Sequence, residues 1–502
     1  MTVLAHRVTG SDANDQLTRD ALAVLQPGFE GTTAPAWLLR QVGEGLTAVG
    51  LFGRNIASPQ QLAALTAQLR AERDDVLVAI DEEGGDVTRL EVRGGSSFPG
   101  NLALGAVDDT ALTRDVAREL GRRLAECGVN LNWAPSADVN SNPDNPVIGV
   151  RSFGADTHLA ARHTAAYVEG LQAAGVAACT KHFPGHGDTN VDSHHALPRI
   201  DVDLDTLVAR ELVPFRAAIA AGTKAVMSAH ILVPALDPTR PATLSPQILT
   251  GLLRKELGYE GLIVTDGMEM NAIAGTYGIE RGSVLAIAAG ADAICVGGGL
   301  ADEATVLRLR DALVAAVREG ALARERLADA AARVRALAAW TRQARAAAAP
   351  GAPLEGSAPG IGLAAARRAV VVSGAAAPVT TPYVATLAPV ANIAVGDETP
   401  WGVAAELAAL VPGTGSGVFP EGASAADVLA AAGERTVVAV VRDAHRHPWM
   451  VQALDALVAA RPDTVVVEMG VPRTEPRGAL YIATHGASRV CGRAAAEVIA
   501  GA

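Results

Sequence analysis

The chain has 502 residues, of which 49% are hydrophobic, and its formal net charge is −12. This length suggests two or three domains, and the apolar content allows a large core and argues against global disorder. The acidic balance, together with the lack of a basic block or a nucleic-acid-binding motif, predicts no nucleic-acid partner.

Neither a targeting segment nor a membrane span is visible. The first residues lack a charged segment followed by an apolar core, and no run of about twenty apolar residues occurs. We therefore expect no membrane partner and a cytoplasmic protein that is a monomer or a weak dimer. Cys179 and Cys295 stand in apolar runs and are expected to be small buried side chains. The cysteine spacing indicates neither a zinc site nor a disulfide framework, so we expect no cofactor.

Between residues 20 and 300, short apolar runs alternate with amphipathic helical patterns. The expected strands are Leu22–Leu25, Ala48–Phe52, Val76–Ile80, Asn130–Trp133, Val176–Cys179, Ala225–Ser228, Leu262–Val264 and Ala293–Val296. The clearest helical patterns are Ser58–Arg73, Asp109–Cys127, Asp156–Ala174 and Ser245–Leu257. Ser58 is followed by a proline, which is typical of a helix N-cap.

Eight strands that alternate with helices predict a (β/α)₈ barrel of the TIM type. The alternative is a doubly wound open sheet. The count of eight and the absence of a GxGxxG turn after an early strand favour the barrel.

A second, smaller α/β domain follows the barrel. Residues 346–360 are rich in Ala, Pro and Gly and read as a linker, so we expect a barrel over 1–345, a linker over 346–365 and a second domain over 366–502. Its expected strands are Ala369–Val372, Asn392–Val395, Val437–Val441, Thr464–Val467 and Leu480–Ala483, and its expected helices are Gly402–Leu410, Ser424–Ala432, Pro448–Ala460 and Arg493–Ala500. The run Asp443–His447 is expected to be a solvated loop.

Polar residues follow most of the central strands of the predicted barrel. Active sites of such barrels lie at the C-terminal ends of the strands, so charged groups at that end predict a site. The residues concerned are Asp81 and Arg89 after the third strand, Arg151 after the fourth, Lys181 and His182 after the fifth, His230 after the sixth and Asp266 after the seventh. As structural alternatives, Asp81 and Asp266 could be helix N-caps, and Glu82 and Glu83 are expected to be solvated.

The stretch Lys181–His195 reads KHFPGHGDTNVDSHH and holds four of the eleven histidines. Its turn-forming residues predict a loop rather than a helix or strand. Asp192 and His194 are two residues apart, so in an extended segment the carboxylate can orient the imidazole.

Five motifs together resemble glycoside hydrolase family 3, and in particular its β-N-acetylglucosaminidase branch. They are IDEEGGDVTRL, NPVIGVRSFG, KHFPGHGDTNVDSHH, VMSAHI and GLIVTDGMEM. The resemblance covers roughly residues 20 to 300 and implies a barrel followed by an α/β sandwich domain. The run Gly267–Met270 departs from many relatives, which carry an Asp directly after the nucleophile.

The resemblance also implies roles for individual residues. Asp266 matches the catalytic nucleophile, His194 the general acid/base and Asp192 the carboxylate that pairs with it. The residues that match sugar-binding positions are Asp81, Arg89, Arg151, Lys181 and His182, and His230 and Met268 are further possible site residues. These residues would perform retaining hydrolysis through a covalent intermediate on Asp266. The implied substrates are small carbohydrates that carry a terminal N-acetylglucosamine, either muropeptides of peptidoglycan recycling or chitooligosaccharides.

Four alternatives stay open at this point. A metal hydrolase could use His182, His186, Asp188, His194 and His195 as ligands. A phosphorylase on the same scaffold is compatible with a histidine acid/base, which repels phosphate less than a glutamate would. A sugar-binding protein without catalysis would require loss of the nucleophile or the acid. A β-glucosidase of the same family would take its acid from the second domain, where the candidates are Glu421, Glu434 and Glu468.

Overall fold

The computed structural model describes residues 10–192, 197–347, 360–376, 379–390, 395–396 and 398–501. Its first domain holds the eight parallel strands β1 Leu25–Pro27, β2 Ala48–Leu51, β3 Leu77–Ile80, β4 Leu131–Asn132, β5 Ala177–Phe183, β6 Ala225–Ser228, β7 Leu262–Thr265 and β8 Ile294–Val296. Strands β2 to β7 pair in chain order, and β1 pairs with β8. A parallel bridge between Val264 and Ala293 joins β7 to the start of β8. This curled sheet confirms the predicted TIM-type barrel.

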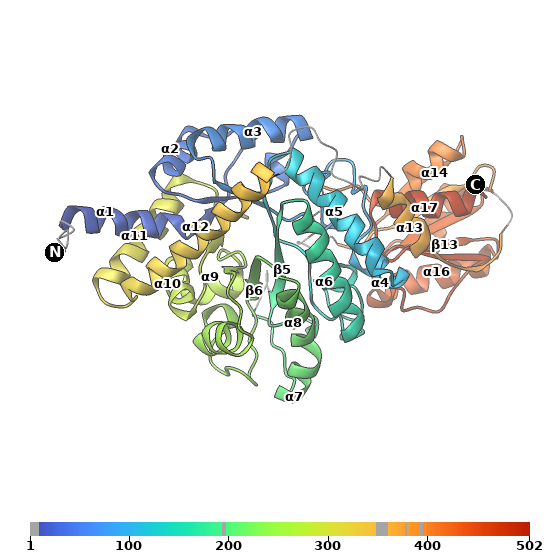
Figure 1. Ribbon diagram of the computed structural model, residues 1–502. Helices are drawn as coiled ribbons and strands as arrows, with labels where there is room; N and C mark the ends of the chain where they lie inside the picture. Colours follow the sequence, from blue (N-terminus) through green and yellow to red (C-terminus); the bar gives the residue numbers. More distant parts are fainter. Residues whose placement is uncertain are drawn as a thin grey trace.

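Helices surround the strands, as Figure 1 shows. The α-helices are α1 Gly10–Ala23, α2 Ala36–Glu44, α3 Pro59–Glu72, α4 Asn101–Val107, α5 Thr110–Glu126, α6 Thr157–Ala173, α7 Leu204–Thr206, α8 Leu212–Ala220, α9 Asn271–Tyr277, α10 Ile279–Ala289, α11 Glu303–Arg318 and α12 Arg324–Ala347. The shorter or wider turns are η1 Gly53–Asn55, η2 Gly149–Arg151, η3 Leu207–Glu211, η4 Ala242–Leu244 and η5 Gln247–Glu256.

Local sequence explains where several helices begin. The Ser58 hydroxyl accepts the backbone N–H of Gln61, which confirms the predicted N-cap of α3. Asp109 and Asp156 cap α5 and α6 in the same way. The first predicted strand was wrong by three residues, because the apolar run from Leu22 continues the buried face of α1 and only its end enters β1.

The second domain is a six-stranded sheet in the order β11-β10-β12-β13-β14-β9, in which only β9 runs antiparallel to its neighbour. Its strands are β9 Val371–Gly374, β10 Tyr383–Leu387, β11 Gly415–Phe419, β12 Val437–Val441, β13 Val465–Glu468 and β14 Leu480–Ala483. Its helices are α13 Ile361–Ala369, α14 Ala404–Leu410, α15 Ala425–Ala432, α16 Pro448–Ala460 and α17 Arg489–Ala500, with a short turn η6 Ala444–Arg446. Apolar clusters bury both faces of the sheet, so this is the expected second α/β layer structure.

Predictions in this domain were less accurate. Helix α13 lies partly within the expected linker and extends to Ala369, so β9 begins later than predicted. Local patterns did not indicate β10, which lies between Thr- and Pro-rich segments, or β11, an edge strand with few apolar residues. Most of the predicted strand Asn392–Val395 lies outside the described residues.

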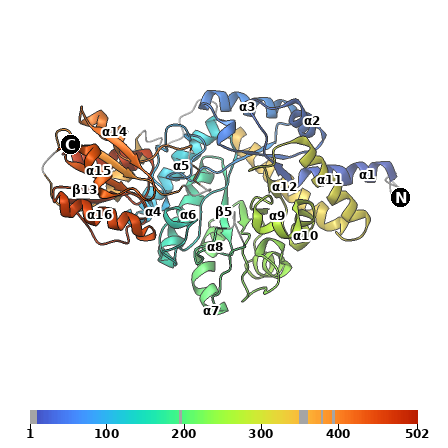
Figure 2. The ribbon, with the colours of Figure 1, turned by 180° about the vertical axis from the view of Figure 1, so that it is seen from behind.

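The second domain packs beside helices α4 to α6 of the barrel (Figures 1 and 2). Its Arg442 forms an ion pair with Asp86 of the barrel, with 2.6 Å between Nη2 and Oδ2. The other oxygen of Asp86 accepts the backbone N–H of Ala487 at 2.7 Å. These contacts bring the loops after β12 and β14 close to the loop after β3. Among the helices that the structure describes, none combines the length and the apolar run needed to cross a bilayer.

Candidate active site

A cavity of about 550 Å³ opens at the C-terminal ends of the barrel strands. It is lined by six of the residues expected in the site, namely Asp81, Arg89, Arg151, Lys181, His182 and Asp266. These residues come from four different strand ends, and they meet because parallel strands present their C-terminal ends to one face of a barrel. Apolar walls are supplied by Phe52, Trp133, Val147, Met227, Met270 and Cys295.

Asp266 directly follows β7 and is half-buried in this cavity. Its Oδ1 accepts the backbone N–H of Gly267 at 2.8 Å. His230 is fully buried, and its two ring nitrogens contact the Gly267 carbonyl at 2.9 Å and the Thr243 hydroxyl at 2.8 Å. It therefore supports the backbone beside Asp266 without lining the cavity, and Met268 is likewise buried in the core, so neither possible site residue faces the cavity.

Lys181 and Arg151 share a buried counter-ion. Lys181 Nζ lies 2.6 Å from Asp81 and 2.8 Å from Glu83, and Arg151 Nη2 lies 2.7 Å from Glu83. Burial alone would raise the pKa of Glu83, but the two cations outweigh it and hold that pKa below its usual range. Burial would lower the pKa of Lys181, and the two carboxylates raise it instead. The two cations are thus held charged and fixed in direction.

The expectation that Glu82 and Glu83 are solvated was wrong, since both side chains are buried. Glu82 accepts the Thr88 hydroxyl and the backbone N–H groups of Arg89 and Leu90, at 2.8 to 3.0 Å. Burial raises the pKa of Glu82 to about 7, against these hydrogen bonds. Glu82 therefore orders the turn that carries Arg89 into the cavity.

Asp138 is a functional residue that sequence reasoning missed. It is fully buried after β4, and its Oδ2 lies 2.7 Å from His182 Nδ1. Its Oδ1 accepts the backbone N–H groups of His182 at 3.2 Å and of His186 at 2.7 Å. Burial opposes ionisation of Asp138, but the interactions with both histidines lower its pKa overall. The only signal in the sequence was an acidic residue shortly after the fourth predicted strand.

The remainder of the loop after β5 is anchored at several points. Arg210 of η3 donates to Asp188 at 2.6 Å and to Glu211 at 2.7 Å. The Asn145 side-chain amide donates to the carbonyls of His186 and Gly187. Asp192 is described and half-buried, whereas the predicted acid/base His194, like His195, lies outside the described residues.

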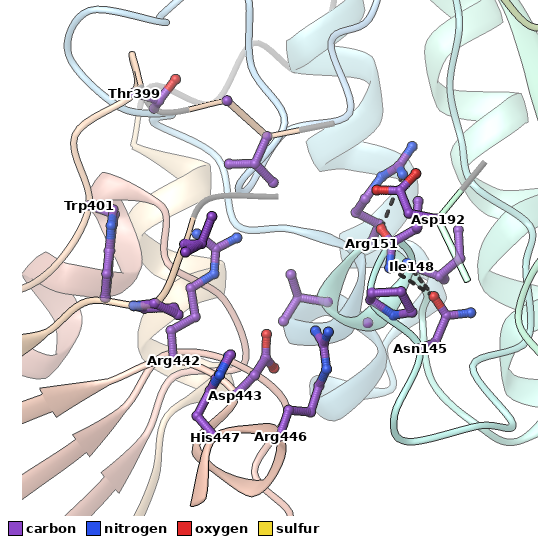
Figure 3. Close-up of a pocket in the computed structure, with 18 residues that line it drawn as sticks. Asn145, Ile148, Arg151, Asp192, Thr399, Trp401, Arg442, Asp443, Arg446 and His447 are labelled. Atoms are coloured by element: carbon purple, nitrogen blue, oxygen red, sulfur yellow. Dashed lines mark hydrogen bonds between the residues drawn. The ribbon is translucent and has the colours of Figure 1, made fainter. Parts of the chain in front are cut away.

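A second cavity, of about 420 Å³, lies between the two domains (Figure 3). The barrel contributes the loop after β4 and Asp192, and the second domain contributes Trp401 and the turn Arg442–His447. Val147 and Arg151 line both cavities. The run Asp443–His447 was expected to be a solvated loop, but it is partly buried because it faces the barrel across this space.

Metal-binding side chains do not converge within the described part of the chain, where no group of three His, Cys, Asp or Glu has suitable geometry. The ring of His182 is instead engaged with Asp138, which also accepts the backbone N–H of His186. Cys179 and Cys295 are buried thiols, as predicted, and burial raises the pKa of both.

Comparisons with known proteins agree with this geometry. The family described as glycosyl hydrolase family 3 N terminal domain matches residues 33–337. Beta-hexosaminidase A of Pseudoalteromonas piscicida is 41% identical over 264 residues, which are 48% of this chain and 44% of that protein. The chain thus spans less than half the length of that relative. A beta-hexosaminidase of Neisseria meningitidis is 36% identical over 265 residues, covering 51% of this chain and 73% of that protein.

Among solved structures, a glycoside hydrolase family 3 beta-N-acetylglucosaminidase from Paenibacillus sp. FPU-7 superposes with a TM-score of 0.85 at 34% identity. That match covers 97% of this chain and 96% of the other, so it includes both domains. Because the family match takes in more than half of the chain, the chain belongs to glycosyl hydrolase family 3.

Proposed function

We propose that the protein is a retaining exo-β-N-acetylglucosaminidase that releases a terminal β-linked N-acetylglucosamine, with Asp266 as its nucleophile. The observation that carries the proposal is the meeting of Asp266 with Asp81, Arg151 and Lys181 around one cavity at the strand ends. The beta-hexosaminidase relatives give the sugar class further support.

In the first step, the Asp266 carboxylate attacks the anomeric carbon, and the bond to the leaving oxygen breaks as His194 gives that oxygen a proton. The products are a covalent glycosyl-enzyme and the free aglycone. In the second step, His194 takes a proton from water, which attacks the anomeric carbon and releases Asp266. Imidazole suits both roles near neutral pH because its unperturbed pKa is about 6.5. Asp192 would orient the ring.

The sugar would be held by the charged rim of the cavity. Lys181 and Arg151 offer donors to hydroxyl oxygens, whereas Asp81 and the Nε2 atom of His182 accept from hydroxyl groups. Because Lys181 and Arg151 are already fixed by Glu83, they need no reorganisation when the sugar binds. The preorganised carboxylates and cations would then stabilise charge that develops at the anomeric centre.

The charge of the lining favours hydrolysis over phosphorolysis. Four carboxylates and three cations line the cavity, which leaves 3 − 4 = −1 with neutral histidines. These groups are Asp81, Glu83, Asp266 and Glu269 against Arg89, Arg151 and Lys181. An anionic phosphate would therefore enter a site without surplus positive charge, whereas the net charge of the site does not hinder neutral water.

The wider role remains part of the same proposal. Removal of N-acetylglucosamine from muropeptides or chitooligosaccharides would supply a recycling pathway in the cytoplasm. The domain limits 1–345, 346–365 and 366–502 are also proposed, and limited proteolysis that cuts within 346–365 would support them.

The direct test compares Asp266→Ala with His194→Ala on aryl N-acetylglucosaminides with good and poor leaving groups. Loss of Asp266 should abolish turnover of both substrates. Loss of His194 should slow the poor leaving group more, because the good one departs without a proton. With a good leaving group, His194→Ala should also accumulate a glycosyl-enzyme, visible by mass spectrometry on the peptide that holds Asp266.

Azide provides a matched control, since it attacks without a general base. It should restore turnover of His194→Ala and yield a β-glycosyl azide. With Asp266→Ala any azide product should instead be the α-anomer, because azide then attacks in place of the missing carboxylate. Equal losses on both leaving groups would refute the acid role of His194. Proton NMR should show the β-anomer as first product, and an α-anomer would remove Asp266 as nucleophile. Turnover should not require phosphate or form a sugar 1-phosphate.

A further inference from the structure

The cavity between the domains is continuous in its lining with the cavity of the barrel. Val147 and Arg151 belong to both, and Asp192 of the loop after β5 lines the space between the domains. In the proposed reaction, the leaving group must lie beside the acid/base loop when it accepts its proton. An aglycone of one sugar or more would therefore extend toward the second domain.

Two arginines of the second domain line this space, and they differ in their partners. Arg442 forms the ion pair with Asp86, and its guanidinium lies 5.8 Å from the centre of the Trp401 ring. Arg446 is half-buried, and among the described residues no carboxylate forms an ion pair with it. Figure 3 shows its side chain directed into the cavity. Arg442 thus holds the domains together, whereas the charge of Arg446 is available to a ligand.

The backbone that carries Arg446 is fixed. The buried carboxylate of Glu468 accepts the N–H groups of Asp443 at 2.9 Å and Ala444 at 3.1 Å. His445 Nε2 lies 2.8 Å from the Pro143 carbonyl of the barrel loop. These contacts secure the turn η6 from both domains. A partly buried arginine on a fixed turn is a suitable donor for a carboxylate, which it can bind through two parallel N–H groups.

The remaining charges around the cavity are already committed or negative. Arg151 is paired with Glu83, and Asp443 Oδ1 accepts the backbone N–H of Val471 at 2.8 Å. Asp443 and Asp192 would accept hydroxyl groups rather than bind an anion. A negative group on the aglycone would therefore be directed to Arg446 and away from these carboxylates.

We propose that Arg446 binds a carboxylate on the aglycone, so that the second domain forms a subsite which selects β-N-acetylglucosaminides of acidic sugars over those of neutral sugars. The inference rests on the proposed function, because it assigns the leaving-group side of that site. It names the substrate class as N-acetylglucosamine linked to a sugar that bears an acidic substituent. Trp401 would supply an apolar wall beside that sugar.

The test uses two disaccharides that differ in one group. N-acetylglucosamine is β-1,4-linked either to N-acetylmuramic acid, which carries a lactyl carboxylate, or to a second N-acetylglucosamine, which does not. An aryl N-acetylglucosaminide serves as the third substrate. Arg446→Gln should lower kcat/KM for the acidic disaccharide about 10- to 100-fold, the worth of one charge-assisted hydrogen bond. The loss should lie mainly in KM and should stay below about threefold for the two neutral substrates.

A matched control is Arg473→Gln, which removes an arginine that is exposed on the same domain and does not line the cavity. It should change none of the three rates. The methyl ester of the lactyl group tests the charge from the ligand side. Wild type should turn over the methyl ester as slowly as Arg446→Gln turns over the free acid. For Arg446→Gln, kcat/KM should be the same for the ester and for the free acid.

Equal losses on all three substrates, or no loss on the acidic disaccharide, would overturn the assignment. Failure of the proposed function would look different, since wild type would then release no N-acetylglucosamine from any of them. In that case, calorimetric titration of Asp266→Asn with the acidic disaccharide still shows whether Arg446 binds the carboxylate. Binding that weakens when Arg446→Gln is added supports the anion site, and unchanged binding refutes it.

Discussion

The carboxylate of Asp138 lies 2.7 Å from Nδ1 of His182. Because an ionised carboxylate only accepts hydrogen bonds, Nδ1 carries the hydrogen and Nε2 is directed to the cavity, 3.4 Å from Arg151. The same carboxylate accepts the backbone N–H of His186 at 2.7 Å. One buried group therefore fixes both His182, which we propose binds the sugar, and the start of the loop that leads to Asp192.

Asp138→Asn tests the contribution of the negative charge, because the amide keeps the size of the side chain but is neutral. We expect KM for an aryl N-acetylglucosaminide to rise about 10-fold, since His182 loses the partner that sets its tautomer. The free energy of unfolding should fall by about 1–3 kcal/mol. Asp138→Ala should raise KM further and lower the free energy of unfolding further. Steady-state kinetics and urea unfolding check this, and an unchanged KM in Asp138→Asn would contradict the role given to it.

Asp138 and Glu83 show where prediction from the sequence stops. The strand order and the residues at the strand ends follow from local patterns, so the sequence alone predicts Asp81, Lys181 and Asp266 as site residues. Local patterns cannot predict which counter-ions pair, because Glu83 and Arg151 are 68 residues apart and Asp138 and His182 are 44 residues apart. Only the closed barrel brings each pair together, and only burial turns an ordinary acidic residue into an obligatory partner.

Glu83→Gln tests the buried ion cluster through its pH dependence. The folded pKa of Glu83 is lowered, so the stability that it contributes is present above its unfolded pKa of about 4.3 and is lost as the pH falls through the folded value. The variant should be less stable than wild type by about 2–4 kcal/mol between pH 6 and 8. The difference should narrow below about pH 4. Urea unfolding curves measured across this pH range test the prediction. A stability difference between wild type and variant that widens at low pH would contradict a lowered pKa of Glu83.

Glu211 should give the opposite dependence. Burial raises its pKa to about 7, despite the adjacent Arg210, and its Oε2 has no hydrogen-bond partner among the described residues. A raised pKa means that stability is fully present below the unfolded value of about 4.3 and is lost as the pH rises through about 7. Glutamine mimics the protonated side chain, so Glu211→Gln should gain about 1–3 kcal/mol relative to wild type between pH 5 and pH 8. A difference that is constant with pH would exclude the titration of Glu211.

Arg210 of η3 ties the loop after β5 to this turn through Asp188, and it is itself held by its neighbour Glu211. In Arg210→Gln the loop that leads to Asp192 and His194 loses this anchor, so proton transfer should suffer more than sugar binding. We expect kcat for a poor leaving group to fall about 5- to 20-fold, with KM changed less than about twofold. A good leaving group should be affected less. Arg199→Gln is the control, since Arg199 is exposed and, among the described residues, its ion pair is with exposed Asp201. An equal loss there would refute a specific anchor.

Gly187 lies where the loop after β5 contacts the segment that follows β4. A methyl group on its Cα would lie 1.7 Å from the Val139 carbonyl oxygen, and 2.5 Å from its carbon, so backbone would have to move. Asn142 N–H donates to the Gly187 carbonyl, so the displacement would pass into the loop after β4, which carries Arg151. Gly187→Ala should therefore lower kcat/KM at least about 100-fold, because a misplacement of about 1 Å has that effect. Gly94→Ala is the control, since the space around Gly94 is open. Full activity in Gly187→Ala would mean that the loop tolerates a shift and does not need this close contact for catalysis.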